Sequence, residues 1–122
     1  MKKFLDWTAL ENEMNILVER MREFHPEILI AAGKEGMVLT ALLANKLGIE
    51  EVGYVSPKNP QLKGTNKKTV IITDIMDASK LGLNNLREAT VKIAALYVKK
   101  GIKPRPDFVL DEIEDASLPW NH

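Results

Sequence analysis

Cysteine is absent from this 122-residue chain, and the formal charge at pH 7 is zero, with 17 Lys plus Arg against 17 Asp plus Glu. The lack of cysteine excludes a disulfide framework, a thiolate zinc site and a cysteine nucleophile. The zero charge removes the simplest case for a nucleic-acid partner, because phosphate-driven binding needs an excess of Lys and Arg. We therefore expect no nucleic-acid partner.

Long hydrophobic runs are also missing. The longest, Ile28–Ala32, falls far short of the ~20 residues that a membrane span needs. At the start of the chain, Asp6 ends the hydrophobic stretch after Phe4 and Leu5 too early for a signal peptide. These absences predict a cytoplasmic protein without a membrane partner.

The residues that are present have the balance of a globular protein. Hydrophobic residues make up 45% of the chain and charged residues 28%, which argues against disorder. The length fits one compact domain, since domains usually run to ~100–200 residues. We expect a single domain over residues 1–122.

The first long element is predicted to be a helix. Hydrophobic residues recur there at intervals of three and four, which places them on one helix face: Trp7, Leu10, Met14, Leu17, Val18 and Met21. Thr8 followed by Glu11 matches a capping box at its start. Pro26 disfavours helix at the residue before it and ends the element.

Short hydrophobic segments alternate with helical patterns along the rest of the chain. Two further helices are predicted at 37–47, ended by Gly48, and from about 81 to 88; strands are predicted at 27–32, 51–55, 69–73, 90–98 and 108–110. Strands that alternate with helices indicate a parallel sheet. The predicted fold class is α/β, a twisted, mainly parallel sheet with helices on both faces.

Two predicted loops lie where such a sheet binds ligands, at the carboxyl ends of its strands. They are residues 33–36 and residues 74–80. In the second loop a buried strand delivers Asp74 and Asp77 to a turn that opens a helix, and a helix N-terminus attracts phosphate. Ser79 can cap that helix or donate to a phosphate oxygen, and Lys80 adds positive charge. The alternative is that both Asp residues only cap the turn.

The second loop and the strand before it, residues 70–81, resemble the phosphoribosyl pyrophosphate motif of the type I phosphoribosyltransferases. There a hydrophobic strand runs into two acids, two variable residues, a third Asp and then Thr-Gly-x-Thr. Four more segments resemble that family in the same order. They are the first strand with its pyrophosphate loop (28–37), the helix after it (42–48), the hood that holds the base in purine enzymes (94–99 with 106–109), and the tail Leu118-Pro119-Trp120-Asn121, which is similar to the Phe-Pro-Trp-Glu of the xanthine and hypoxanthine branch.

The resemblance implies transfer of ribose 5-phosphate from phosphoribosyl pyrophosphate to a purine nitrogen, assisted by Mg²⁺ held mainly by the ligand's phosphates. By position, Asp77 would be catalytic beside the purine and Asp74 would hold a ribose hydroxyl. The remaining implied contacts are the 5′-phosphate at Ala78, Ser79, Lys80 and Leu81, pyrophosphate at Lys34, Glu35 and Gly36, and the base at Lys99, Phe108 and Val109. Residues from about 99 to 122 would form a reduced hood.

Several departures from the family pattern fall on the phosphate side. Thr73 stands in place of the first acid, and Ala78-Ser79-Lys80-Leu81 replaces Thr-Gly-x-Thr. Glu35 replaces a Gly in the pyrophosphate loop, and at an effective dielectric of ~20 like charges ~4 Å apart repel by roughly 4 kcal/mol. Residues 56–68 are also short for the mobile hairpin that closes over the site in this family. On the base side, Lys99 is equally well explained as a solvated charge at a strand end, and Phe108 as a core residue.

The leading hypothesis is a phosphoribosyltransferase-related protein that keeps a purine, nucleotide or phosphoribosyl pyrophosphate pocket but has weak or no transferase activity. One alternative is an active Mg²⁺-dependent purine phosphoribosyltransferase acting on a 6-oxopurine. Another is a structural or regulatory subunit that acts as a homodimer, with Met37, Leu39 and Tyr54 as candidate interface residues.

Overall fold

The computed structural model describes residues 2–64 and 66–120, so the predicted likeness at Asn121 lies outside the described residues. The elements in chain order are β1 (Lys2–Phe4), α1 (Trp7–Arg22), β2 (Ile28–Ala32), α2 (Gly33–Leu47), β3 (Val52–Val55), β4 (Thr69–Met76), the 3₁₀-helix η1 (Ala78–Leu86), β5 (Val91–Lys99), β6 (Phe108–Ile113) and β7 (Asp115–Ser117).

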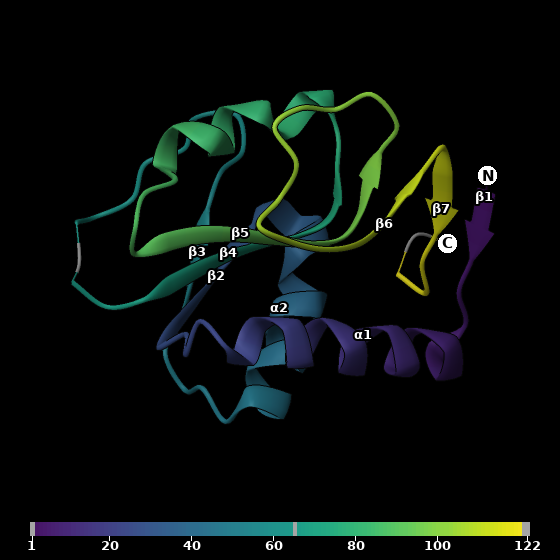
Figure 1. The fold of residues 1–122 in the computed structure, drawn as a ribbon, viewed down its shortest axis with the longest axis horizontal. Coiled ribbons are helices and arrows are strands. Elements are labelled where there is room, and N and C mark those ends of the chain that lie inside the picture. Colours follow the sequence, from purple (N-terminus) through teal and green to yellow (C-terminus); the bar gives the residue numbers. More distant parts are fainter. Residues whose placement is uncertain (1, 65, 121–122) are drawn as a thin grey trace.

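The main sheet has five strands in the order β3-β2-β4-β5-β6, and every neighbouring pair is parallel. Helices α1 and α2 cover one face of it, and η1 lies over the other (Figure 1). The predicted α/β class, with a parallel sheet between helices, is confirmed. A second, two-stranded sheet joins β1 to β7 at one end of the molecule, and the sequence patterns did not reveal it (Figure 1).

The core has two layers because successive strand residues point to opposite faces of the sheet. Val70 and Ile72 of β4 pack toward α1 and α2, whereas Ile71 between them packs with Leu83 of η1 on the other face. All five residues of β2 are buried, as predicted for a strand covered on both sides.

The predicted hydrophobic face of α1 is confirmed at Leu10, Met14, Leu17, Val18 and Met21, which are all buried. It is wrong at Trp7, which is exposed at the first position of the helix and lies against Trp120, with 6.3 Å between the ring centroids. The capping residue is also different from the prediction. Asp6, not Thr8, caps the helix, because its Oδ1 accepts a hydrogen bond of 2.8 Å from the backbone N–H of Ala9.

Two strands run further than predicted, and both extensions affect the candidate site. β4 continues through Asp74 to Met76, because Ile75 and Met76 pair with Tyr97 and Val98 of β5. β6 continues to Ile113 rather than ending at Leu110, because its last residues also pair with β5. Pairing with a neighbouring strand therefore decides where each strand ends.

Tyr97 is fully buried in β5, and its hydroxyl donates a hydrogen bond of 2.9 Å to Glu13 Oε1. Burial, followed by the hydrogen bond and charge of Glu13, raises the pKa of Tyr97 well above its ordinary value of 10.0. The unfolded chain therefore ionises this phenol first, so the stability contribution is complete below the ordinary pKa and is lost as pH rises above it.

We expect the free energy of unfolding to fall above about pH 10 with a slope of up to ~1.4 kcal/mol per pH unit from this group. Urea unfolding across that range measures the slope. Tyr97→Phe should reduce it, whereas Tyr54→Phe, at an exposed tyrosine, should leave it as in the wild type. Equal slopes in wild type and Tyr97→Phe would contradict the prediction.

Candidate functional site

The carboxyl ends of β2, β3 and β4 meet at one edge of the sheet and lead into α2, the segment after Val55, and η1. A cavity of about 350 Å³ lies there, which is within the size range of small-ligand sites. Its lining comes from all three connections: Gly33, Lys34, Glu35, Tyr54, Ser56, Pro57, Lys58, Ser79 and Lys80. Three lysines and one glutamate line it; because Lys80 is paired with the Asp74 carboxylate, the lining has an excess of one positive charge, which suits an anionic ligand.

The predicted pyrophosphate loop is the first turn of α2 and not a loop. Gly33 has a φ of 74°, which lets the chain pass directly from β2 into the helix. Gly36 lies so close to β4 that a Cβ atom there would come within 2.5 Å of the Ile72 carbonyl oxygen. The N-cap residue, Ala32, makes no side-chain capping bond, so this turn presents backbone N–H groups beside Lys34 and Glu35.

Asp74 lies inside β4 and not in the turn, and it is only 3% exposed. Its Oδ1 accepts hydrogen bonds from the backbone N–H of Ile75 at 2.7 Å and from the Lys80 ammonium at 3.1 Å. Its Oδ2 accepts from the indole N–H of Trp120 at 3.3 Å. Asp74 is the residue expected to hold a ribose hydroxyl, and both of its carboxylate oxygens therefore already accept hydrogen bonds from within the protein.

The turn after β4 is capped by its own side chain. Asp77 Oδ1 accepts hydrogen bonds from the backbone N–H of Ser79 at 3.0 Å and from its hydroxyl at 2.5 Å. Ala78, Ser79 and Leu81 are exposed, whereas Lys80 is buried. The element that follows is a 3₁₀-helix from Ala78 and not a helix from about Leu81, as expected of a segment with Gly82, Asn84 and Asn85, which favour helix poorly.

Thr73 occupies the position of the first acid in the family motif. It is fully buried, and its Oγ1 has no hydrogen-bond partner among the described residues. Thr73 therefore supplies neither a charge nor an exposed oxygen to the cavity.

The three predicted base-binding residues are not brought together. Lys99 is the last residue of β5 and pairs with Ile113. Phe108 is the first residue of β6 and pairs with Ala94, which lies five residues, or about 16 Å, before Lys99 along β5. Phe108 packs on Phe24, with 6.1 Å between ring centroids, and the Val109 carbonyl accepts a 2.5 Å hydrogen bond from Arg20 of α1. The end of β6, and not its start, reaches the edge with the cavity.

Trp120, which is not among the predicted site residues, contacts Asp74 directly. Its place in the Leu118-Pro119-Trp120 tail, which resembles a family motif, was the signal that could have indicated this contact. Leu118 is fully buried and anchors the tail in the core.

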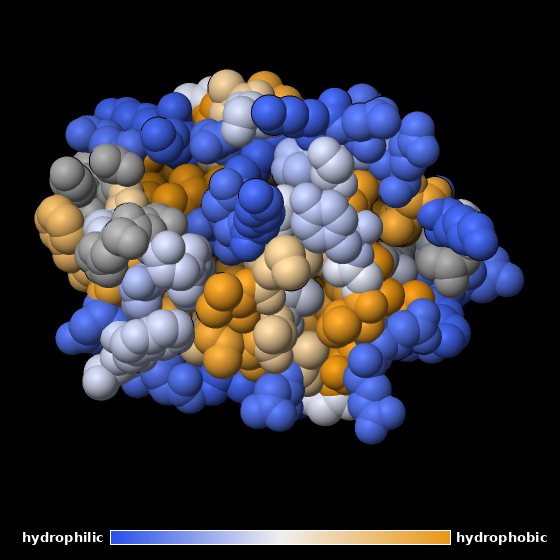
Figure 2. All heavy atoms as spheres, turned by 180° about the vertical axis from the view of Figure 1, so that it is seen from behind, coloured by the Kyte–Doolittle hydropathy of each residue, from blue (hydrophilic) through white to orange (hydrophobic). Residues whose placement is uncertain are grey.

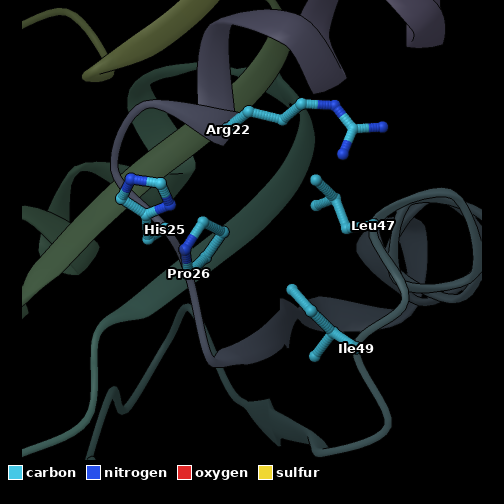
Figure 3. Close-up of a pocket in the computed structure, with 5 residues that line it drawn as sticks. All are labelled: Arg22, His25, Pro26, Leu47 and Ile49. Carbon is cyan, nitrogen blue, oxygen red and sulfur yellow. The ribbon is translucent and has the colours of Figure 1, made fainter.

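A second cavity of about 330 Å³ lies between the end of α1 and the end of α2. Figure 3 shows His25 and Pro26 on one side of it, Leu47 and Ile49 on the other, and the Arg22 side chain extending from α1 toward Leu47. None of the predicted site residues lines this cavity.

The described residues hold no group of three or more His, Asp or Glu side chains placed to bind a metal ion. Within the same ranges, no helix has the length and hydrophobicity to cross a membrane.

Solved structures resemble this one over almost their whole length. A purine phosphoribosyltransferase from Pyrococcus horikoshii has a TM-score of 0.82 and 22% identity, covering 99% of this chain and 95% of its own. The Helicobacter pylori xanthine-guanine-hypoxanthine phosphoribosyltransferase has a TM-score of 0.80 and 19% identity, covering 99% and 94%. A hypothetical protein from Neisseria gonorrhoeae with bound ppGpp has a TM-score of 0.73 and 19% identity, covering 100% and 90%. No protein-family model and no curated protein matches the sequence.

These likenesses identify the fold: the chain has the α/β fold of the type I phosphoribosyltransferases. The fold expected from the sequence resemblance is thereby confirmed.

Proposed function

We propose that this protein is related to the purine phosphoribosyltransferases and binds a nucleotide or phosphoribosyl ligand in the cavity at the carboxyl edge of its sheet, with weak or no transferase activity. The observation that carries the proposal is that Lys34 of α2 and Ser79 and Lys80 of η1 line the same cationic cavity. These residues stand at the positions that the resemblance gives to pyrophosphate and to the 5′-phosphate. The named enzymes with this fold support a purine-type ligand.

We propose weak transferase activity because the acidic positions of the family motif are either occupied by other contacts or lack a carboxylate. Asp74 is enclosed by Lys80 and Trp120, and Thr73 adds no carboxylate. Phosphoryl and glycosyl transfer depend on positioned groups that stabilise the charge of the transition state. A site without those groups can retain binding and lose turnover.

Calorimetric titration with GMP, IMP, XMP and phosphoribosyl pyrophosphate tests the pocket. We add ppGpp, because a structure with this fold is described with that ligand bound. We expect at least one of the five to bind, and Lys34→Met to weaken it by roughly tenfold, the scale of one charged hydrogen bond. Lys103→Met, at an exposed lysine that does not line the cavity, is the matched control. Absence of binding by all five at millimolar concentration would reject the pocket.

An active enzyme is the second candidate, and the half-buried position of Asp77 beside Ser79 favours it, since that carboxylate keeps access to solvent. In this candidate Asp77 is the catalytic residue and Mg²⁺ is carried by the ligand's phosphates. Turnover of a 6-oxopurine with phosphoribosyl pyrophosphate, lost in Asp77→Asn, would support it. Equal rates with and without protein would reject it.

A homodimer remains part of the proposal. Met37 is 52% and Tyr54 54% exposed, but Leu39 is fully buried in the core, so its predicted place in an interface is wrong. Val38 and Val52 are the other exposed hydrophobic residues of α2 and β3. Hydrophobic side chains gather in the middle of the face seen in Figure 2. Sedimentation as a monomer at micromolar concentration would reject the dimer.

The single domain with a reduced hood also remains a proposal. Of residues 99–122, those up to Ile113 include β6 of the main sheet. After the main sheet, the described part of the chain continues with β7, which pairs with β1, and then with residues 118–120.

A further inference from the structure

Lys80 is an unusual member of the cavity lining because it is only 7% exposed. Its ammonium lies 2.7 Å from the Ile75 carbonyl oxygen and 3.1 Å from Asp74 Oδ1. An ammonium has three N–H donors, and these two acceptors use two of them. Lys80 therefore brings a buried positive charge to the candidate site, and this charge is held by groups of β4.

The resemblance to phosphoribosyltransferases implies Mg²⁺ held mainly by the ligand's phosphates, and the side chains at this edge of the sheet do not fit as further ligands of that ion. Mg²⁺ binds carboxylate oxygens and water in a near-octahedral arrangement. Asp74 already accepts three hydrogen bonds, and the Lys80 charge 3.1 Å from its Oδ1 repels a second cation. Asp77 accepts from Ser79, and Thr73 supplies a neutral hydroxyl that is fully buried.

We propose that the Lys80 ammonium takes the place of a divalent metal ion at Asp74, so that ligand binding does not depend on a metal ion. The remaining N–H of the ammonium bonds an anionic oxygen of the ligand in the cavity. The ligand part of this proposal rests on the proposed function. The metal part of the proposal does not depend on a ligand: it rests on the hydrogen bonds that Asp74 accepts from Ile75, Lys80 and Trp120 and on those that Asp77 accepts from Ser79.

Calorimetry of the wild type in EDTA and in MgCl₂, with the tightest of the five ligands above, tests the ligand part. We expect the same affinity in both buffers. Lys80→Met should lose about tenfold or more in EDTA, the scale of one charged hydrogen bond, and recover part of it on addition of Mg²⁺. Wild-type binding that requires Mg²⁺ would overturn this inference and leave the proposed function standing. Absence of binding in both buffers would reject the proposed function and the ligand part together.

Titration of Mn²⁺ alone into ¹⁵N-labelled wild-type protein tests the metal part without any ligand. Bound Mn²⁺ broadens the signals of nearby amides, so we expect no selective broadening at Asp74 to Asp77. Selective broadening there would overturn the inference, even if nucleotides bind. This measurement needs no variant. For the calorimetry, circular dichroism first shows whether Lys80→Met is folded.

Discussion

Lys80→Met is expected to lower the free energy of unfolding by about 3–5 kcal/mol, because it leaves the buried Asp74 carboxylate without its positive partner. The side chains of the pair are 9% and 4% exposed, so water compensates poorly for the lost ammonium. Folded domains are stable by only ~5–15 kcal/mol, so the loss is a large share of the total. Urea unfolding followed by circular dichroism measures it.

Two variants separate the charge effect from simple loss of packing. Asp74→Asn added to Lys80→Met removes the uncompensated charge, so the double variant should be more stable than Lys80→Met alone. Lys34→Met, at an exposed lysine of the same cavity, should change stability by less than about 0.5 kcal/mol. If Lys80→Met were as stable as Lys34→Met, the prediction that the buried Lys80–Asp74 ion pair is needed for stability would be wrong.

Gly36→Ala is expected to destabilise the protein by roughly 1–3 kcal/mol through overpacking. The added Cβ would lie 2.5 Å from the Ile72 carbonyl oxygen, and a backbone atom in the centre of the sheet cannot move aside as a flexible side chain can. Alanine has the higher helix propensity by about 1 kcal/mol, which acts in the opposite direction and is outweighed by the clash. Thermal or urea unfolding measures the net change.

Gly82→Ala is the matched control for this prediction. A Cβ at Gly82 meets its nearest neighbour, the Pro57 carbonyl oxygen, at the ordinary distance of 3.6 Å. We expect no loss of stability there, and a gain of about 0.4–1 kcal/mol from the lower entropy of the unfolded chain.

Because Gly36 holds the first turn of α2 against β4, Gly36→Ala should also weaken the binding of any ligand beside Lys34. Unchanged stability in Gly36→Ala would show that α2 can shift away from β4.

Local patterns were sufficient for the parts of the fold that depend on burial. The unbroken hydrophobic run Ile28–Ala32 and the β-branched start of β4 are enough to predict strands covered on both faces. The hydrophobic face of α1 and the Gly48 end of α2 could be predicted in the same way, since each depends on residues within a few positions of one another. A parallel sheet between helices follows from the order of these elements.

The candidate site was predicted less completely, because its geometry depends on pairs far apart in the chain. Lys34, Ser79 and Lys80 could be chosen from the sequence, since the carboxyl ends of parallel strands meet at one edge. The positions of Phe108 and Val109 could not, because they follow from how far β6 pairs with β5. The direction of the Lys80 side chain, toward Asp74 and away from solvent, is likewise absent from any local pattern.

Burial and periodicity among neighbouring residues were enough to predict the fold class, the alternation of strands and helices in the main sheet, and the segments that bring charged residues to its edge. The ends of the strands, the helical start at residues 33–36, the pairing of β1 with β7 and the hydrogen bonds of Asp74 with Lys80 and Trp120 follow from the packed chain. Asp74 and Trp120 are 46 residues apart, so their hydrogen bond depends on how β4 and the C-terminal tail pack together. Hydrogen bonds and ion pairs between distant segments depend on the packed backbone, which no single stretch of sequence specifies.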